Sequence, residues 1–138
     1  MTRQQLPLFP DLDAVDPAAV DDRVRDLSAR LPPRIRLGTS SWSFPGWTGL
    51  VYAARNGNPA TEQTLASHGL AAYAAHPLLR TVSLDRTFYA PLTAPEFAAY
   101  AAQVPDHFRF VVKGPAAFTD AAIRKSGSGE PARDKSWH

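Results

Sequence analysis

Residues 35–47 read Ile-Arg-Leu-Gly-Thr-Ser-Ser-Trp-Ser-Phe-Pro-Gly-Trp, and we interpret the rest of the chain around this stretch. Its first half alternates and contains aliphatic residues, which is typical of a β-strand. Gly38 lets the backbone approach another group closely, and hydroxyl side chains and two tryptophans follow it. Because α/β proteins usually carry their sites at the carboxyl ends of strands, this strand and loop predict one edge of a site.

The composition is that of a soluble globular domain. The chain has 138 residues, of which 44% are apolar and 10% aromatic, so one domain with a real core is expected. No apolar run approaches the ~20 residues needed to cross a bilayer, and the first thirteen residues do not have the pattern of a secretory signal. We therefore expect a cytoplasmic protein with no membrane partner.

Charge and cysteine content exclude some functions. The absence of cysteine excludes disulfides, thiolate nucleophiles and Cys-ligated zinc. His68 and His76 lie eight residues apart without a second ligand pair at metal spacing, so neither a metal site nor a cofactor is predicted. The net charge of +2 makes no strong case for direct nucleic-acid binding.

Residues 1–15 are expected to form an extended, mobile tail, because prolines interrupt them. Residues 5–9, Gln-Leu-Pro-Leu-Phe, resemble the short motif by which bacterial replication and repair proteins dock on the DNA polymerase sliding clamp, with Pro7 departing from the pattern at its third place. The resemblance implies that the clamp is a partner. The alternative is that the apolar side chains pack on the protein's own surface. The residues concerned are Gln5, Leu6, Leu8 and Phe9.

An amphipathic helix is predicted over residues 16–33. Asp16-Pro17 is typical of a helix start, and Pro32-Pro33 ends the segment. Apolar residues recur between them at helical spacing, at Val20, Val24, Leu27 and Leu31. Three arginines on this helix, Arg23, Arg25 and Arg30, are interpreted as its solvated face rather than as a nucleic-acid contact.

Residues 34–124 alternate between strand and helix patterns. A helix is predicted from Thr61 to Ala75, a strand over 81–85, a helix that begins with a Thr93–Glu96 capping box, and a strand over 108–112. This order predicts an α/β fold with about three parallel strands joined by helical crossovers. Residues 125–138 have no core-forming pattern and are expected to be a flexible tail.

Three motifs in this order resemble the YecE-like family, known as domain of unknown function seventy-two. They are Gly38 to Trp42 with Pro45-Gly46-Trp47, Thr81 to Tyr89, and Phe108 to Pro115, so the resemblance covers roughly residues 34–119. It implies a TIM-type β/α barrel, of which this chain has the N-terminal part, and no established activity.

Two departures from the family pattern affect the interpretation. Many members have glutamate and asparagine where this chain has Ser83 and Asp85, so a role of that glutamate does not carry over to Ser83. Three strands leave a barrel sheet with an open edge. We therefore expect a truncated, inactive product, and the alternative is a small domain that completes its sheet by self-association.

If the strands are parallel, polar and aromatic residues converge at their carboxyl ends. Asp85 is a candidate general base or a partner that orients Arg86, and Lys113 is a candidate anion clamp or nucleophilic amine. The remaining candidates for ligand binding are Ser40, Ser41, Trp42, Trp47, Arg86 and Tyr89. Each also has a purely structural interpretation, as an ion pair, a core aromatic ring or a turn hydroxyl.

Two function classes remain open. The first is a barrel-type protein that binds or acts on a small anionic or phosphorylated ligand at this edge. The second is a non-catalytic accessory protein, associated with DNA repair through the clamp motif.

Overall fold

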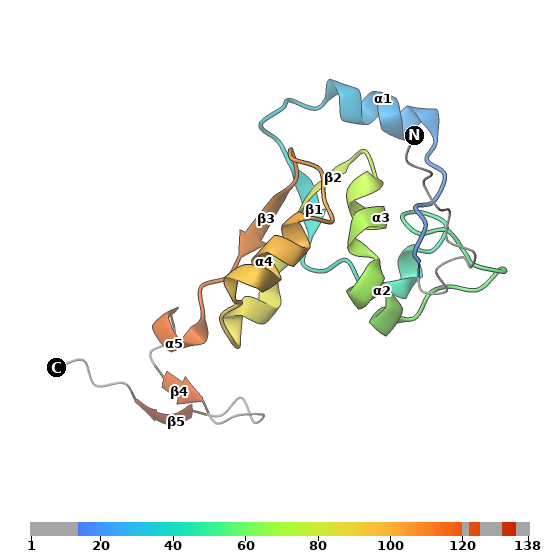
Figure 1. Ribbon diagram of the computed structural model, residues 1–138. Coiled ribbons are helices and arrows are strands. Elements are labelled where there is room, and N and C mark those ends of the chain that lie inside the picture. Colours follow the sequence, from blue (N-terminus) through green and yellow to red (C-terminus); the bar gives the residue numbers. More distant parts are fainter. Residues whose placement is uncertain (1–13, 120–121, 125–130, 135–138) are drawn as a thin grey trace, which may run out of the picture.

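The computed structural model describes residues 14–119, 122–124 and 131–134, and Figure 1 shows the arrangement of their helices and strands. The helices are α1 (Asp22–Arg30), α2 (Glu62–His68), α3 (Leu70–Ala75), α4 (Ala94–Ala101) and α5 (Ala116–Thr119), with short 3-10 helices η1 (Pro45–Trp47) and η2 (Asp85–Phe88). The strands are β1 (Leu37–Thr39), β2 (Leu79–Leu84), β3 (Arg109–Val112), β4 (Ala122–Arg124) and β5 (Pro131–Asp134).

Strands β1, β2 and β3 form one parallel sheet in that order (Figure 1). Thr39 lies opposite Val82 and Leu84 lies opposite Val112, so the three strands end at a common edge. The predicted parallel α/β organisation is confirmed. In the described part of the chain this three-stranded sheet does not close into a barrel.

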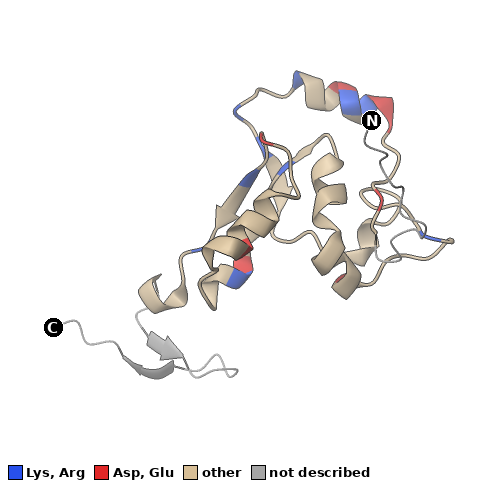
Figure 2. Ribbon diagram, viewed as in Figure 1, with Lys and Arg blue, Asp and Glu red and all other residues tan. Residues whose placement is uncertain are grey.

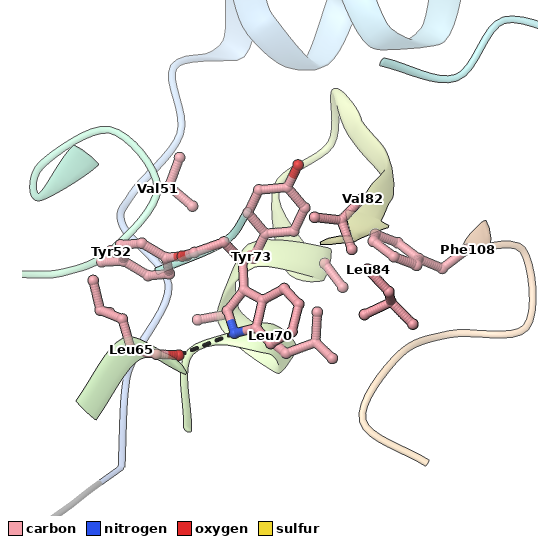
Figure 3. Close-up of a cluster of buried hydrophobic side chains, with 11 residues drawn as sticks. Val51, Tyr52, Leu65, Leu70, Tyr73, Val82, Leu84 and Phe108 are labelled. Atoms are coloured by element: carbon pink, nitrogen blue, oxygen red, sulfur yellow. Dashed lines mark hydrogen bonds between the residues drawn. The ribbon is translucent and has the colours of Figure 1, made fainter. Parts of the chain in front are cut away.

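The core lies between this sheet and the helices of its crossovers (Figure 3). Leu70 and Tyr73 of α3 belong to one buried cluster with Val82 and Leu84 of β2. Tyr100 and Val104, on α4 and just after it, pack against the same cluster. Because one cluster joins both helices, they cover the same face of the sheet. Val111, on the other face, is 55% exposed.

Gly38 is the point of closest approach between β1 and β2. A Cβ atom at this position would lie 2.0 Å from the carbonyl oxygen of Thr81, so only glycine fits. Beside it, the buried hydroxyl of Tyr73 accepts a hydrogen bond from the backbone N–H of Thr39 (3.0 Å) and donates one to the Thr81 carbonyl (3.1 Å). The close approach predicted for Gly38 is therefore between two strands of the sheet, and a helix side chain joins them.

The first helix begins later than predicted. Asp21 caps α1 by accepting a hydrogen bond from the backbone N–H of Arg23 (2.7 Å), so the Asp16-Pro17 start is wrong. Residues 16–18 are instead extended and bond to residues 51–53. The tertiary contacts of this segment replace the helical turn that its local sequence favours.

The predicted helix from Thr61 to Ala75 is two short helices that meet at Gly69. Thr61 caps α2, as expected for a threonine at this position, and Gly69 separates α2 from α3. The Thr93–Glu96 capping box at the start of α4 is confirmed.

Strand β5 pairs antiparallel with β4 and falls within the segment 125–138, which the sequence predicts to be flexible. Across the described ranges, no helix has the length and apolar character needed to span a membrane.

Candidate functional site at the carboxyl edge of the sheet

Asp85 and Lys113 meet where β2 and β3 end. The Lys113 ammonium nitrogen lies 3.1 Å from Asp85 Oδ1, and the same oxygen accepts a hydrogen bond of 2.5 Å from the Ser83 hydroxyl. The Asp85 side chain is 40% exposed and the Lys113 side chain is 51% exposed. The two residues proposed as catalytic are thus brought together as a half-exposed ion pair at the strand ends.

The surroundings of Asp85 favour its ionised form. The hydrogen bonds from Ser83 and then Lys113 lower the pKa of the Asp85 carboxyl below its ordinary value. The carboxylate is therefore charged near neutral pH and is a weak proton acceptor there.

Thr87 holds the two strand ends in register below this pair. Its buried hydroxyl lies 2.6 Å from the carbonyl oxygen of Leu84 and 2.8 Å from that of Lys113. Because Leu84 ends β2 and Lys113 follows β3, one side chain connects the backbones that carry the ion pair. The sequence does not single out this threonine, since a hydroxyl in a polar loop is common.

Arg86 belongs to a second cluster and does not pair with Asp85. Its guanidinium donates to Glu96 Oε1 (3.1 Å) and to the Tyr100 hydroxyl (3.0 Å). The other oxygen of Glu96, Oε2, belongs to the capping box and accepts a hydrogen bond from the Thr93 backbone N–H at 2.8 Å. Contacts with Thr93 lower the pKa of the Glu96 carboxyl most, and Arg86 adds to the effect. The expectation that Asp85 orients Arg86 is therefore corrected.

The two tryptophans lie in the core rather than at the edge. Trp42 is 9% exposed, its indole N–H donates to the Leu65 carbonyl at 3.1 Å, and its ring packs edge-on against Tyr100. Trp47 is half-buried and lies beside Tyr73, with ring centroids 6.2 Å apart. From the sequence alone, a tryptophan after a strand can be either a ligand-stacking residue or a core aromatic residue. Here both rings pack against other aromatic side chains of the protein.

Ser40, Ser41 and Tyr89 are exposed. The serines directly follow β1, and Ser41 shares a hydrogen bond of 3.0 Å with Ser43. Tyr89 is 85% exposed and contacts Phe88 edge-on, with centroids 5.4 Å apart. These three side chains are accessible to a ligand, although none of them contacts the Asp85–Lys113 pair.

A pocket of about 470 Å³ lies elsewhere, between Asp16 and the loop and helix start at residues 53–64. None of the predicted site residues lines it. Within the residues that the structure describes, no group of three or more His, Asp or Glu side chains is placed to hold a metal ion. The predicted clamp-binding residues, Gln5, Leu6, Leu8 and Phe9, lie outside the described part of the chain.

The comparisons with known proteins give one match. A family model described as "Protein of unknown function DUF72" matches residues 36–135 of the 138, and thus extends beyond the three motifs to include β4 and β5. No curated protein and no solved structure matches the chain. The match covers more than half of the sequence and contains every residue of the carboxyl edge. The chain belongs to the DUF72 family, whose function is unknown.

Proposed function

We propose that the carboxyl edge of the sheet binds a small anionic ligand, such as a phosphate or a carboxylate, and that Lys113 is its clamp. The observation that carries this proposal is the half-exposed Asp85–Lys113 pair at the ends of two adjacent parallel strands. An ammonium group has three N–H donors. One of them is directed at Asp85, and the others are available to an anion from solvent.

In this proposal Asp85 positions Lys113 and does not transfer protons. Its lowered pKa makes it a poor general base near neutral pH, whereas a fixed carboxylate holds the ammonium group in one place. Ser83 fixes the carboxylate in turn. A nucleophilic lysine is normally deeply buried, and the half-exposed Lys113 side chain fits a clamp better.

Further ligand contacts are proposed for the exposed groups around the pair. Arg86 is 58% exposed and is held in place by Glu96 and Tyr100, and we propose that its remaining N–H groups contact a second oxygen of the ligand. Ser40, Ser41 and Tyr89 are the remaining polar groups that follow the strands. They are proposed as rim contacts on the basis of exposure alone.

A thermal-shift titration with inorganic phosphate tests the clamp. A ligand at ten times its Kd stabilises the folded protein by about 1.4 kcal/mol. We expect this stabilisation in the native protein and its loss in Lys113→Met, which keeps the length of the side chain. Arg23→Gln, which removes one positive charge from α1, is the matched control. Equal stabilisation of Lys113→Met by phosphate would refute the proposal.

We also propose that the three-stranded sheet is a segment of a β/α barrel. Both crossover helices cover one face of the sheet, as they do on the outside of a barrel. The opposite face carries Val111 and, by strand alternation, Ser83. Sedimentation together with hydrogen exchange tests whether that face is covered by self-association: a concentration-dependent dimer with protected β3 amides would favour a small self-associating domain.

A second proposed function rests on residues 5–9. Their pattern supports docking on the bacterial DNA polymerase sliding clamp, with Leu8 and Phe9 in an apolar pocket and Gln5 at its rim. Binding of the full chain to a purified clamp, with Leu8→Ala and Phe9→Ala as variants, tests it. We expect each variant to weaken binding at least tenfold. An unchanged affinity in both variants would remove this function.

A further inference from the structure

Five arginines gather at the end of the sheet opposite to the candidate ligand site. The sequence spreads them over 80 residues, and the fold brings them to the amino ends of the strands. Figure 2 shows blue segments on α1, on the connection that follows it and where the three strands begin. The arginine patch consists of Arg30, Arg34, Arg36, Arg80 and Arg109.

Strand pairing places three of these residues on adjacent strands. Arg36 directly precedes β1, Arg80 is the second residue of β2, and Arg109 is the first residue of β3. Arg109 pairs with Thr81, next to Arg80, and Leu37 pairs with Leu79. Since neighbouring strands lie about 4.8 Å apart, the three backbones span roughly 10 Å.

The end of α1 is attached to the same place. The buried Ser28 hydroxyl donates to the Pro77 carbonyl at 2.6 Å, and the Arg80 guanidinium lies 2.9 Å from the Ser28 hydroxyl oxygen. These contacts fix the carboxyl end of the helix near the start of β2. Arg30 ends α1, and Arg34 follows in the short connection to β1.

No arginine of the patch forms a salt bridge with a carboxylate in the described part of the chain. Arg109 donates to the backbone carbonyls of Asp106 (2.6 Å) and Phe108 (2.7 Å), and Arg30 donates to the Asp26 carbonyl (3.4 Å). The salt bridges of the described residues, by contrast, lie at the opposite edge and use Arg86 and Lys113. Four members, all but the intermediate Arg80, are exposed.

We propose that the arginine patch binds the phosphodiester backbone of nucleic acid without sequence preference. Guanidinium forks bind phosphate oxygens in pairs, and several of them gathered at one end of the sheet can contact phosphates that repeat along a strand. A single small anion would use only one or two of the five. The net charge of +2 does not reveal this patch, because it sums the charges of the whole chain.

Fluorescence anisotropy with a labelled 20-base-pair DNA duplex and the full chain, over 50–200 mM salt, tests the proposal. For the wild type we expect log K to fall with log salt with a slope near −3 or steeper, at about −0.9 for each phosphate contact. The triple variant Arg34→Gln, Arg36→Gln, Arg109→Gln should bind at least tenfold more weakly at 50 mM salt, with a slope reduced by about 3. Arg80 is left unchanged because it contacts α1.

A matched triple variant controls for overall charge. Arg23→Gln, Arg25→Gln, Arg55→Gln removes the same number of positive charges outside the patch, and we expect it to keep most of the affinity. Circular dichroism and thermal unfolding establish that both triple variants fold. Equal losses in the two variants, or no salt-dependent binding by the wild type, would overturn the proposal. Patch-dependent binding to phosphatidylglycerol vesicles without binding to DNA would overturn it as well.

Discussion

Replacing Gly38 with alanine is expected to destabilise the fold strongly, through a clash between β1 and β2. The new Cβ would lie 2.0 Å from the Thr81 carbonyl oxygen and 2.6 Å from its carbonyl carbon. These are backbone atoms of the central strand, so they cannot move aside as a flexible side chain can. The two strands must separate locally or change register.

The magnitude follows from two contributions. Overpacking a well-packed site costs about 1–3 kcal/mol, and the involvement of backbone places this case near the upper value. Separating the strands also weakens the hydrogen bonds of the Tyr73 hydroxyl to Thr39 and Thr81, each contributing about 1 kcal/mol. We therefore expect a loss of roughly 3–4 kcal/mol in the free energy of unfolding.

Urea denaturation followed by tryptophan fluorescence measures this loss. With an m-value of about 2 kcal/mol/M, the midpoint should fall by roughly 1.5–2 M. Gly57→Ala is the matched control: its Cβ would meet no atom within 4 Å, and its positive φ of 78° costs alanine only about 1–2 kcal/mol. If Gly38→Ala were no less stable than Gly57→Ala, the close approach between the strands would be refuted.

Three further predictions concern single side chains. Tyr73→Phe should lower the free energy of unfolding by about 1–3 kcal/mol in urea, because the part-buried backbone N–H of Thr39 loses its acceptor, while Tyr89→Phe at an 85% exposed position should change it by less than about 0.5 kcal/mol. Thr87→Val should cost about 1–2 kcal/mol in the same assay, since two backbone carbonyls lose their shared donor. For Asp85 the folded-state pKa lies below 3.8, so its contribution to stability is complete above that pH and disappears as the pH falls through the folded value. In a carboxyl NMR titration, Ser83→Ala should move the midpoint up toward 3.8, and an unmoved midpoint would contradict the role of that hydroxyl.

The sequence predicts the order of helices and strands along the chain because strong helix and strand boundary signals separate them. Prolines and a capping box delimit the segments. The three apolar runs interpreted as strands are too short for helices, so three strands alternating with helices could be inferred. The family was recognisable for the same reason, since three motifs follow one another at strand ends. The match to residues 36–135 confirms that assignment.

Tertiary contacts explain what the sequence does not predict in the fold. Asp16-Pro17 has the local pattern of a helix start, but the backbone of residues 16–18 bonds to residues 51–53. Nothing in the local pattern indicates a partner so far along the chain. The local sequence likewise does not predict the break between α2 and α3 at Gly69, because one glycine within an alanine-rich helix is usually tolerated at a cost of about 1 kcal/mol.

The sequence predicts that the candidate site residues lie at the carboxyl ends of the strands, but it does not predict all of the contacts between their side chains. Strand register alone brings Asp85 and Lys113 to one edge, and this could be inferred from parallel strands. The choice of Glu96 as the partner of Arg86 depends on how α4 packs, which no spacing in the sequence reveals. The burial of Trp42 could not be predicted either, because its one polar group, the indole N–H, is satisfied by the carbonyl of Leu65 in a distant segment.

The buried hydroxyl of Tyr73 also determines how the sheet can open. A three-residue strand that has one strand neighbour in the described part of the chain, such as β1, would ordinarily fray and exchange its amide protons readily. Here the amide of Thr39 is bonded to a side chain of α3, which itself bonds to β2. The strand is released only when the helix moves away from the sheet, so edge strand, central strand and helix should exchange their protons as one cooperative unit.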